Sequence, residues 1–302
     1  MKKRLPNFLI VGAAKSGTSS LHNYLNQHKD IFMPSYNNKG MKVKEPRFLI
    51  KDLVEHRLHN GIWSWEEYQS LFDSVKKEKA IGESTVLYLY YYEYAINNIK
   101  KLLGDDIKII IMLRSPTDRA YSAFQHVSRG FKEQHSFEEA LEIEEGRLDR
   151  NPELTPMVMY KEMGMYSKMV QAYKNAFENV HIILYEDFRD NTKEEIMKTF
   201  TFLELSKDEN IDFITQHNVG GKRWKNNHIK YIFMNQNPIK SILKILIPNK
   251  IRASLRKKLV NISTNKVEEM NDQTREKLNS IFKEDVKKLS KIINRDVTHW
   301  TK

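Results

Sequence analysis

The sequence predicts an α/β fold, a three-layer sandwich in which a central parallel sheet is flanked by helices. Uninterrupted apolar runs at residues 7–11, 107–113 and 180–185 are typical of strands that are buried on both faces. Each run is followed by apolar residues at helical spacing, and parallel neighbours require crossover connections of this kind. Strands that alternate with helices therefore indicate one parallel sheet with helices on both sides.

The first predicted unit is a strand, a loop and a helix near the N-terminus. The apolar run at residues 7–11 ends at Gly12, and after a turn Leu21, Leu25 and His28 recur at helical spacing. A short additional strand is expected at residues 80–82. This unit places a glycine-rich turn between a buried strand and a helix.

The later units repeat the pattern. The run at residues 107–113 precedes a helix that carries Ala120 and Phe124, and the run at 180–185 precedes a helix at about 192–203. An apolar stripe between residues 278 and 293 marks a last helix, opened by Asn271 or Asp272. We expect this helix to close the domain.

Composition favours a folded protein of enzyme size. The 302 residues are 40% hydrophobic and 29% charged, and we expect one domain over residues 1–302. The absence of Cys excludes disulfides, thiolate metal ligands and a cysteine nucleophile. The short apolar run after the basic N-terminus is cut at Lys15, so a strand is favoured over a signal peptide, and we expect a cytoplasmic protein without a membrane span.

The formal charge of +11 is concentrated in one segment. Residues 213–267 contain twelve Lys or Arg and no Asp or Glu. Apolar clusters within residues 225–265 make this segment an amphipathic insertion. It fits a groove for an acidic acceptor, a peripheral contact with anionic lipid at the inner membrane surface, or a solvated face.

The loop after the first strand carries the main functional signal. Gly12-Ala13-Ala14-Lys15-Ser16-Gly17-Thr18-Ser19-Ser20 links a strand to a helix, so backbone N–H groups and the helix dipole can hold an anion. The arrangement is P-loop-like, but Lys15 precedes the second glycine, whereas the nucleoside-triphosphate loop places lysine after it. This order disfavours a kinase or ATPase. The sequence also lacks a clear acidic residue at a strand end that could bind magnesium.

Residues 8–19 resemble the 5'-phosphosulfate loop of sulfotransferases that use 3'-phosphoadenylyl sulfate (PAPS), in particular the Golgi-type heparan sulfate enzymes and their bacterial relatives. A second motif of that family has an Arg at a strand end and a Ser eight residues later, which together hold the 3'-phosphate. Arg114 and Ser122 occupy these places. Arg supplies a planar fork for phosphate oxygens, and Ser adds a neutral donor two helical turns into the helix.

The resemblance implies transfer of a sulfuryl group from PAPS to a hydroxyl or amine. The product of the donor is then adenosine 3',5'-bisphosphate (PAP), and no metal is required. The resemblance also implies that Lys15 meets the bridging and sulfuryl oxygens and that Glu45 is the catalytic base with Lys44 beside it. His126 is a second candidate base, because imidazole titrates near neutrality. The expected donor-binding set is Lys15, Ser16, Gly17, Thr18, Ser19, Arg114, Ser122, Gly221, Lys222 and Arg223.

The acceptor is less constrained. Trp63 and Trp65 suggest a platform for a sugar ring, although packing under a loop explains them equally well. We expect a glycan, free or lipid-linked, or another hydroxyl compound as acceptor, and no nucleic acid as partner. Two alternatives stay open: a P-loop kinase or ATPase, and a membrane or nucleic-acid binding module that uses the basic insertion.

Overall fold

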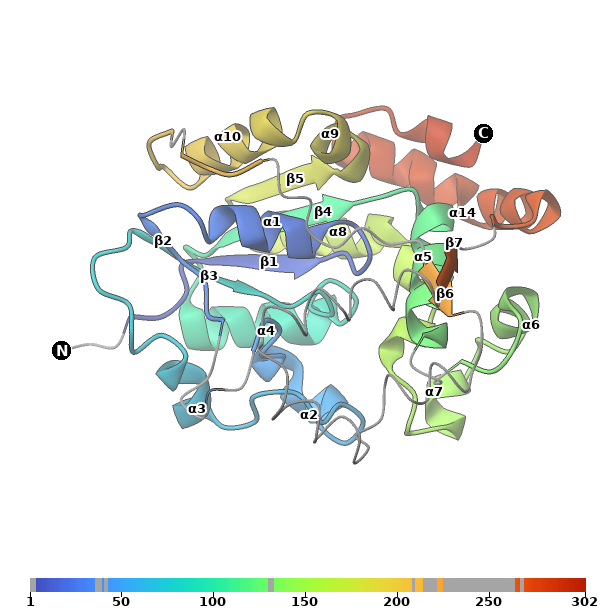
Figure 1. Ribbon diagram of the computed structural model, residues 1–302, viewed down its shortest axis with the longest axis horizontal. Coiled ribbons are helices and arrows are strands. Elements are labelled where there is room, and N and C mark those ends of the chain that lie inside the picture. Colours follow the sequence, from blue (N-terminus) through green and yellow to red (C-terminus); the bar gives the residue numbers. More distant parts are fainter. Residues whose placement is uncertain are drawn as a thin grey trace, which may run out of the picture.

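The computed structural model describes residues 4–35, 40, 43–129, 133–207, 210–213 and 269–302, and the backbone alone of 222–224 and 264–266. A five-stranded sheet lies at its centre, in the order β2-β3-β1-β4-β5, and every pair of neighbours is parallel (Figure 1). The strands are β1 (Phe8–Gly12), β2 (Ile31–Phe32), β3 (Ala80–Ser84), β4 (Lys108–Leu113) and β5 (Val180–Leu184). The predicted fold class is confirmed.

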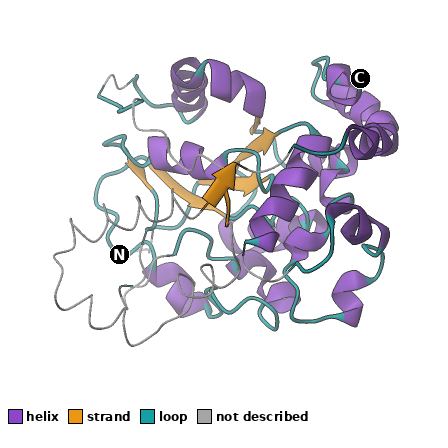
Figure 2. Ribbon diagram, turned by 45° about the vertical axis from the view of Figure 1, so that its right-hand side comes forward, coloured by secondary structure: helices purple, strands orange, loops and turns teal. Residues whose placement is uncertain are grey.

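Helices cover both faces of the sheet, as the turned view also shows (Figure 2). The α-helices are α1 (Thr18–Leu25), α2 (Lys51–Val54), α3 (Trp65–Ser70), α4 (Tyr92–Leu103), α5 (Pro116–Ser128), α6 (Phe137–Glu142), α7 (Arg147–Arg150), α8 (Tyr166–Ala176), α9 (Tyr185–Asp190), α10 (Thr192–Phe202) and α14 (Asp272–Ile292). Short 3-10 turns lie at Phe48–Ile50, Pro156–Val158, Glu162–Gly164 and Thr298–Thr301, and β6 (Lys222–Trp224) pairs antiparallel with β7 (Thr264–Lys266).

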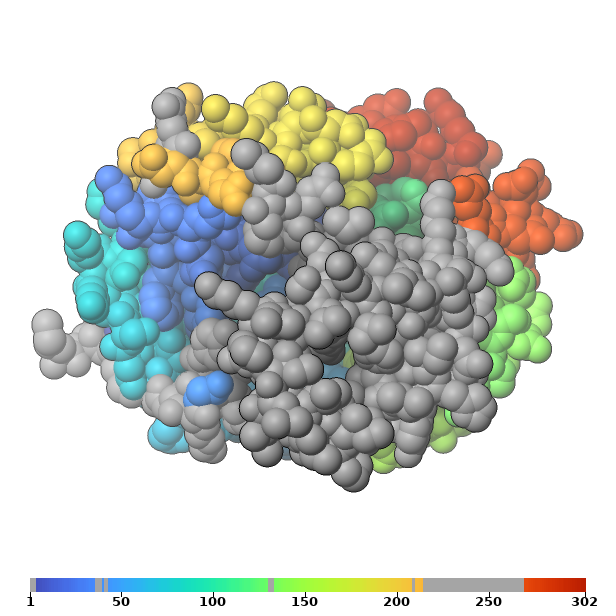
Figure 3. Space-filling view, viewed as in Figure 1, coloured from blue at the N-terminus to red at the C-terminus, as the bar shows by residue number. Residues whose placement is uncertain are grey.

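Alternation along the strands divides the core into two layers. Phe8 and Ile10 of β1 pack with α1, α9 and α10, whereas Leu9 and Val11 pack with α4, α5, α8 and α14. All four side chains are fully buried, because successive strand residues point to opposite faces of a sheet that is covered on both sides. In space-filling form the α10 segment lies against the α1 segment (Figure 3).

The strand order creates a switch point at β1. β1 pairs with β3 on one side and with β4 on the other. In open parallel sheets, ligands bind beyond the carboxyl ends of the strands where the connections diverge in this way. The loop after β1 therefore lies at the edge where a ligand is expected.

Most predicted boundaries fall within two residues of the observed ones, and Asn271 caps α14 by accepting a hydrogen bond from the Gln273 N–H at 2.8 Å. One assignment at β5 was wrong: Tyr185 opens α9 instead of ending the strand. Glu186 and Asp187 in the first turn favour a helix start there, because acidic side chains stabilise a helix N-terminus. Among the described residues no helix is long and apolar enough to cross a bilayer.

Replacing Gly12 with Ala should destabilise the fold, because the new methyl group has no room. It would lie 2.5 Å from Leu89 Cβ and 3.2 Å from the carbonyl oxygen of Val86. We expect a loss of about 1–3 kcal/mol in the free energy of unfolding, measured by urea denaturation. An unchanged midpoint would contradict this close packing of β1 against residues 86–89.

Candidate functional site

The loop between β1 and α1 is fixed to the end of β4. The Ala13 N–H donates to the carbonyl oxygen of Met112 at 2.7 Å. Gly17 adopts φ +95° at the N-cap of α1, and a Cβ there would meet Met112 and Tyr185 at 3.2 Å. Glycine suits this position because it accepts positive φ without strain. The loop thus turns sharply and opens the start of α1 toward the carboxyl edge of the sheet.

The start of α1 provides backbone donors. Within the described part of the chain, the N–H groups of Gly17, Thr18 and Ser19 have no hydrogen-bond partner. Unsatisfied N–H groups and the positive end of the helix dipole favour an anion at this point. No acidic residue lies in the first turn of α1 to compete for it.

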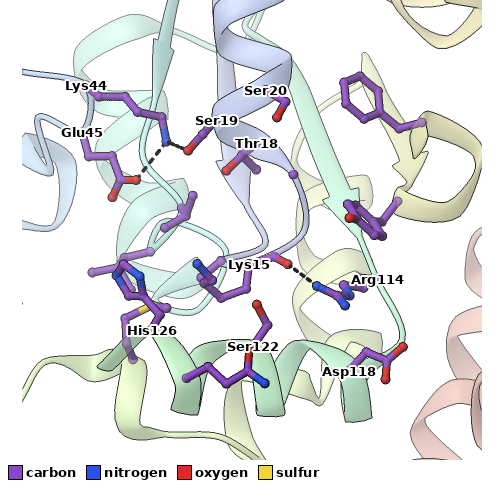
Figure 4. A pocket seen from close by; sticks show the side chains of 18 of the residues that line it. Lys15, Thr18, Ser19, Ser20, Lys44, Glu45, Arg114, Asp118, Ser122 and His126 are labelled. Atoms are coloured by element: carbon purple, nitrogen blue, oxygen red, sulfur yellow. Dashed lines mark hydrogen bonds and ion pairs between the residues drawn. The ribbon is translucent and has the colours of Figure 1, made fainter. Parts of the chain in front are cut away.

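A cavity of about 980 Å³ opens in front of this helix start. It brings together groups from the β1–α1 loop, the segment 44–47, the β4–α5 connection and α9 (Figure 4). The predicted site residues that line it are Lys15, Gly17, Thr18, Ser19, Lys44, Glu45, Arg114, Ser122 and His126. Predicted site residues up to 111 positions apart in the sequence (15 to 126) therefore share one cavity.

Arg114 lies directly after β4 and faces the loop. Its guanidinium donates to the carbonyl oxygen of Lys15 at 3.4 Å and stacks over the Tyr185 ring, with its carbon 4.8 Å from the ring centroid. This stacking holds the planar fork in place while its outer N–H groups stay available to an anion. Ser122, two turns into α5, points into the same part of the cavity (Figure 4).

The segment after residue 43 places the predicted base in the cavity. Lys44 Nζ donates to Ser19 Oγ at 2.8 Å and lies 3.2 Å from Glu45 Oε1. The other carboxylate oxygen of Glu45 lies 3.6 Å from the Arg47 guanidinium. Glu45 is therefore held between two cations and beside the start of α1.

Positive charge accumulates around Lys15. Burial lowers its pKa most, followed by the charges of Arg129, Arg114 and Lys44, and Glu45 opposes them only in part, so that the pKa of Lys15 falls to about 8. Neither Lys15 nor Arg114 forms an ion pair with a carboxylate among the described residues. Such a cluster is costly until an anion neutralises it.

His126 also lines the cavity. Burial of the ring lowers its pKa most, and the charges of Lys15 and Arg129 lower it further, to about 4. The charge of Glu45 acts in the opposite direction. The imidazole is therefore neutral at pH 7. It is therefore a weak base.

A comparison with known protein families decides among the functions that such a cation-lined cavity can serve. Residues 5–290 match the sulfotransferase domain. The chain belongs to the sulfotransferase family.

Related proteins agree with this assignment. The sulfotransferase is 25% identical over 253 residues to carbohydrate sulfotransferase 15 of Homo sapiens, a match that covers 67% of this chain and 44% of that protein. It is 29% identical over 123 residues to the bifunctional heparan sulfate N-deacetylase/N-sulfotransferase 3 of Homo sapiens, covering 41% of this chain and 13% of that protein. The chain thus spans less than half the length of these relatives.

A solved structure matches the whole fold. The crystal structure of a sulfotransferase from Alicyclobacillus acidocaldarius superimposes with a TM-score of 0.72 at 29% identity, covering 99% of this chain and 100% of that one. The sheet and the flanking helices are therefore those of a known sulfotransferase.

Three predicted residues do not reach the cavity of this sulfotransferase. Ser16 is fully buried and does not line the cavity. Trp65 stacks on Tyr68 at 5.7 Å and packs on Phe48, and Trp63 packs against the same core layer. The structure thus shows packing contacts for both indoles, and neither lines the cavity.

Other predictions fall outside the described residues. Gly221 is not described, and for Lys222 and Arg223 only the backbone of β6 is. The basic insertion at about 225–265 also lies outside them, apart from the backbone of residues 264 and 265 in β7. Its contact with membrane or acceptor, and the cytoplasmic location, stay predictions.

Arg129 and Tyr185 are two of the cavity residues that sequence reasoning missed. Arg129 follows Ser122 by seven positions and His126 by three, so helical spacing on α5 could have identified it. Tyr185 lacked a local signal, because its contact with Arg114 joins segments 71 residues apart (185 − 114).

The C-terminus positions the Tyr185 helix of the sulfotransferase. Trp300 Nε1 donates to Glu186 Oε1 at 2.6 Å, and Arg295 pairs through two nitrogens with Asp187, one of them at 2.8 Å. These contacts tie α9 to the chain after α14. They fix the ring on which Arg114 rests.

Binding of PAP should take up a proton near pH 8. Lys15 loses its charge as the pH rises through about 8, and a bound anion raises its pKa, so the affinity should fall as pH increases from 8 to 10. Calorimetry in two buffers of different ionisation enthalpy measures the proton uptake. The matched Lys15→Arg variant stays charged and should show none; an affinity of wild type that is independent of pH would contradict the lowered pKa of Lys15.

Proposed function

We propose that this sulfotransferase transfers a sulfuryl group from PAPS to a hydroxyl or amine of a carbohydrate acceptor. The observation that carries the proposal is the group of cations without carboxylate partners, Lys15 and Arg114, beside the free N–H groups at the start of α1. A nucleotide with phosphates at both the 3' and 5' positions would satisfy both ends of this arrangement. The carbohydrate and heparan sulfate sulfotransferases among the chain's relatives support carbohydrate as the acceptor class.

The two phosphate sites would be divided between two strands. Arg114 and Ser122, after β4, would hold the 3'-phosphate, and Arg114 is already aligned by the Tyr185 ring. The backbone donors of Gly17 to Ser19 and the ammonium of Lys15, after β1, would hold the 5' side. Because β1 and β4 are neighbours, the two sites lie along one edge of the sheet.

PAPS supplies an activated sulfuryl group, and its transfer leaves negative charge on the bridging oxygen. Lys15 would stabilise this charge, since a compact ammonium suits a point of developing charge. Lys44 would support the same region, because its ammonium lies at hydrogen-bond distance from Ser19 at the start of α1. These residues act by position and charge, the main sources of catalysis in a direct displacement.

Glu45 would accept the proton of the acceptor. Its carboxylate lies within the cavity next to Lys44 and Arg47, which hold it in one orientation. His126, whose pKa is about 4, would remain neutral at pH 7 and orient the acceptor through a hydrogen bond. This division makes Glu45 the base and His126 a neutral partner.

Removal of the Arg114 side chain should weaken PAP binding by roughly 10- to 100-fold, because charge-assisted hydrogen bonds to phosphate are lost. Isothermal titration of PAP without added magnesium into wild type and Arg114→Ala measures this effect. Arg150→Ala removes the same charge from an exposed position outside the cavity and should bind as wild type does. Equal affinity of wild type and Arg114→Ala would contradict the assignment of the 3'-phosphate site.

Glu45→Gln should slow sulfuryl transfer by about 100-fold or more without weakening PAP binding, because the variant lacks only the proton acceptor. The measurement is single-turnover transfer of radiolabel from PAPS to heparosan oligosaccharides. His126→Gln keeps a neutral hydrogen-bonding group and should lose much less. The reverse order, with His126→Gln inactive and Glu45→Gln active, would assign the base to His126.

A further inference from the structure

Arg129 is a cation of the cavity that has no role in the division described above, and unlike Arg189, which pairs with Asp190, it has no ion-pair partner among the described residues. Arg129 follows directly after α5 and lines the cavity. Its Nε is buried without a hydrogen-bond partner, and its side chain forms no ion pair within the described part of the chain. Burial lowers its pKa, and no carboxylate contributes in the opposite direction. A partly buried guanidinium in this state lacks a negative partner.

Helix α5 places Arg129 at the far end of the cavity from the 3'-phosphate site. The residues of α5 that face the cavity include Asp118, Ser122 and His126, and Arg129 continues the same stripe. Seven residues of α-helix correspond to a rise of about 10 Å, so Arg129 lies about two turns beyond Ser122. Arg129 is therefore remote from the 3'-phosphate site that Ser122 marks.

The charge of Arg129 acts at the reacting centre. It contributes more than Arg114 to the lowered pKa of Lys15, and it also lowers the pKa of His126. Arg129 is therefore close to the two side chains assigned to the sulfuryl group and to the acceptor. An anion bound by Arg129 would lie beside the acceptor atom that reacts.

Apolar side chains complete the surface of the cavity. Leu58, Leu87 and Met157 line it together with Arg47 and Arg129. Arg47 already pairs with Glu45, whereas Arg129 has no such partner. A neutral acceptor would displace water from the Arg129 guanidinium without replacing its hydrogen bonds, which is unfavourable.

We propose that Arg129 is a specificity-determining residue that binds a carboxylate, sulfate or phosphate group of the acceptor next to the hydroxyl or amine that is sulfated. The preferred acceptor is then an acidic carbohydrate. The inference rests on the proposed function. It adds the requirement for a negative charge on the acceptor and assigns the residue that reads this charge.

A pair of probes that differ only in charge tests the proposal. Heparosan and chondroitin hexasaccharides carry uronate carboxylates, and reduction of these groups to alcohols leaves the sugar chain otherwise unchanged. Each probe is titrated calorimetrically into the PAP-saturated full chain. The proteins are wild type, Arg129→Ala, Arg129→Lys and the control Arg189→Ala, which removes an arginine of α9 that lines the same cavity.

Wild type should bind at least one acidic hexasaccharide about tenfold or more tightly than its reduced form. Arg129→Ala should lose this preference while its affinity for PAP and for the reduced probe stays unchanged. Arg129→Lys should keep part of the preference for the acidic probe, because a point charge replaces the planar fork. Arg189→Ala should discriminate as wild type does.

Three outcomes would overturn the proposal. Equal binding of acidic and reduced probes by wild type, or binding of none of them, would remove the requirement for charge. An unchanged preference in Arg129→Ala would assign the charge recognition to another group. A loss of PAP or PAPS affinity in Arg129→Ala would place Arg129 on the donor. Failure of wild type to bind PAP is a separate result, since it would contradict the proposed function itself.

Discussion

The hydrogen bond from the Ala13 N–H to the Met112 carbonyl oxygen joins the ends of β1 and β4, and the site depends on this junction. It brings the helix-start donors of one strand–helix unit beside the Arg114 of the next. Close packing supports this junction, because Gly17 lies so near Met112 and Tyr185 that a Cβ would be 3.2 Å from both side chains. Tyr185 is held in turn through α9, where Glu186 and Asp187 contact Trp300 and Arg295. The cavity is thus organised before a ligand binds.

Electrostatics then determines what the cavity accepts. Lys15 and Arg114 line the cavity without carboxylate partners among the described residues, and Glu45, which also lines it, is already paired with Lys44 and Arg47. The protein tolerates this excess of positive charge because β-strands, helices and the Tyr185 ring fix each cation separately. An anionic donor would neutralise the repulsion between these cations, and the energy that this releases would contribute to the affinity. Burial, and after it the neighbouring positive charges, lowers the pKa values of Lys15 and His126.

The sequence was sufficient for the fold class because buried parallel strands are continuous apolar runs, as at 107–113, and for the loop between β1 and α1 because its glycines are local signals. The strand order and the two-residue β2 were not predictable, since they depend on pairings between distant segments. Tyr185 was missed for the same reason. For Trp63 and Trp65 the sequence left a sugar platform and packing under a loop equally open, because both roles use the same residue types. The structure shows the packing contacts of both side chains, and the role in sugar binding stays a prediction.

In the proposed function, the cavity recognises a nucleotide through a 3'-phosphate as well as a 5'-phosphate. The most direct measurement compares the affinities of PAP and of adenosine 5'-monophosphate, by calorimetry in the presence of EDTA. The account predicts that PAP binds at least about tenfold more tightly, because the second phosphate meets Arg114 and Ser122. Equal affinities for the two nucleotides would contradict recognition of the 3'-phosphate. Tight binding of ATP that requires magnesium would favour the kinase or ATPase interpretation.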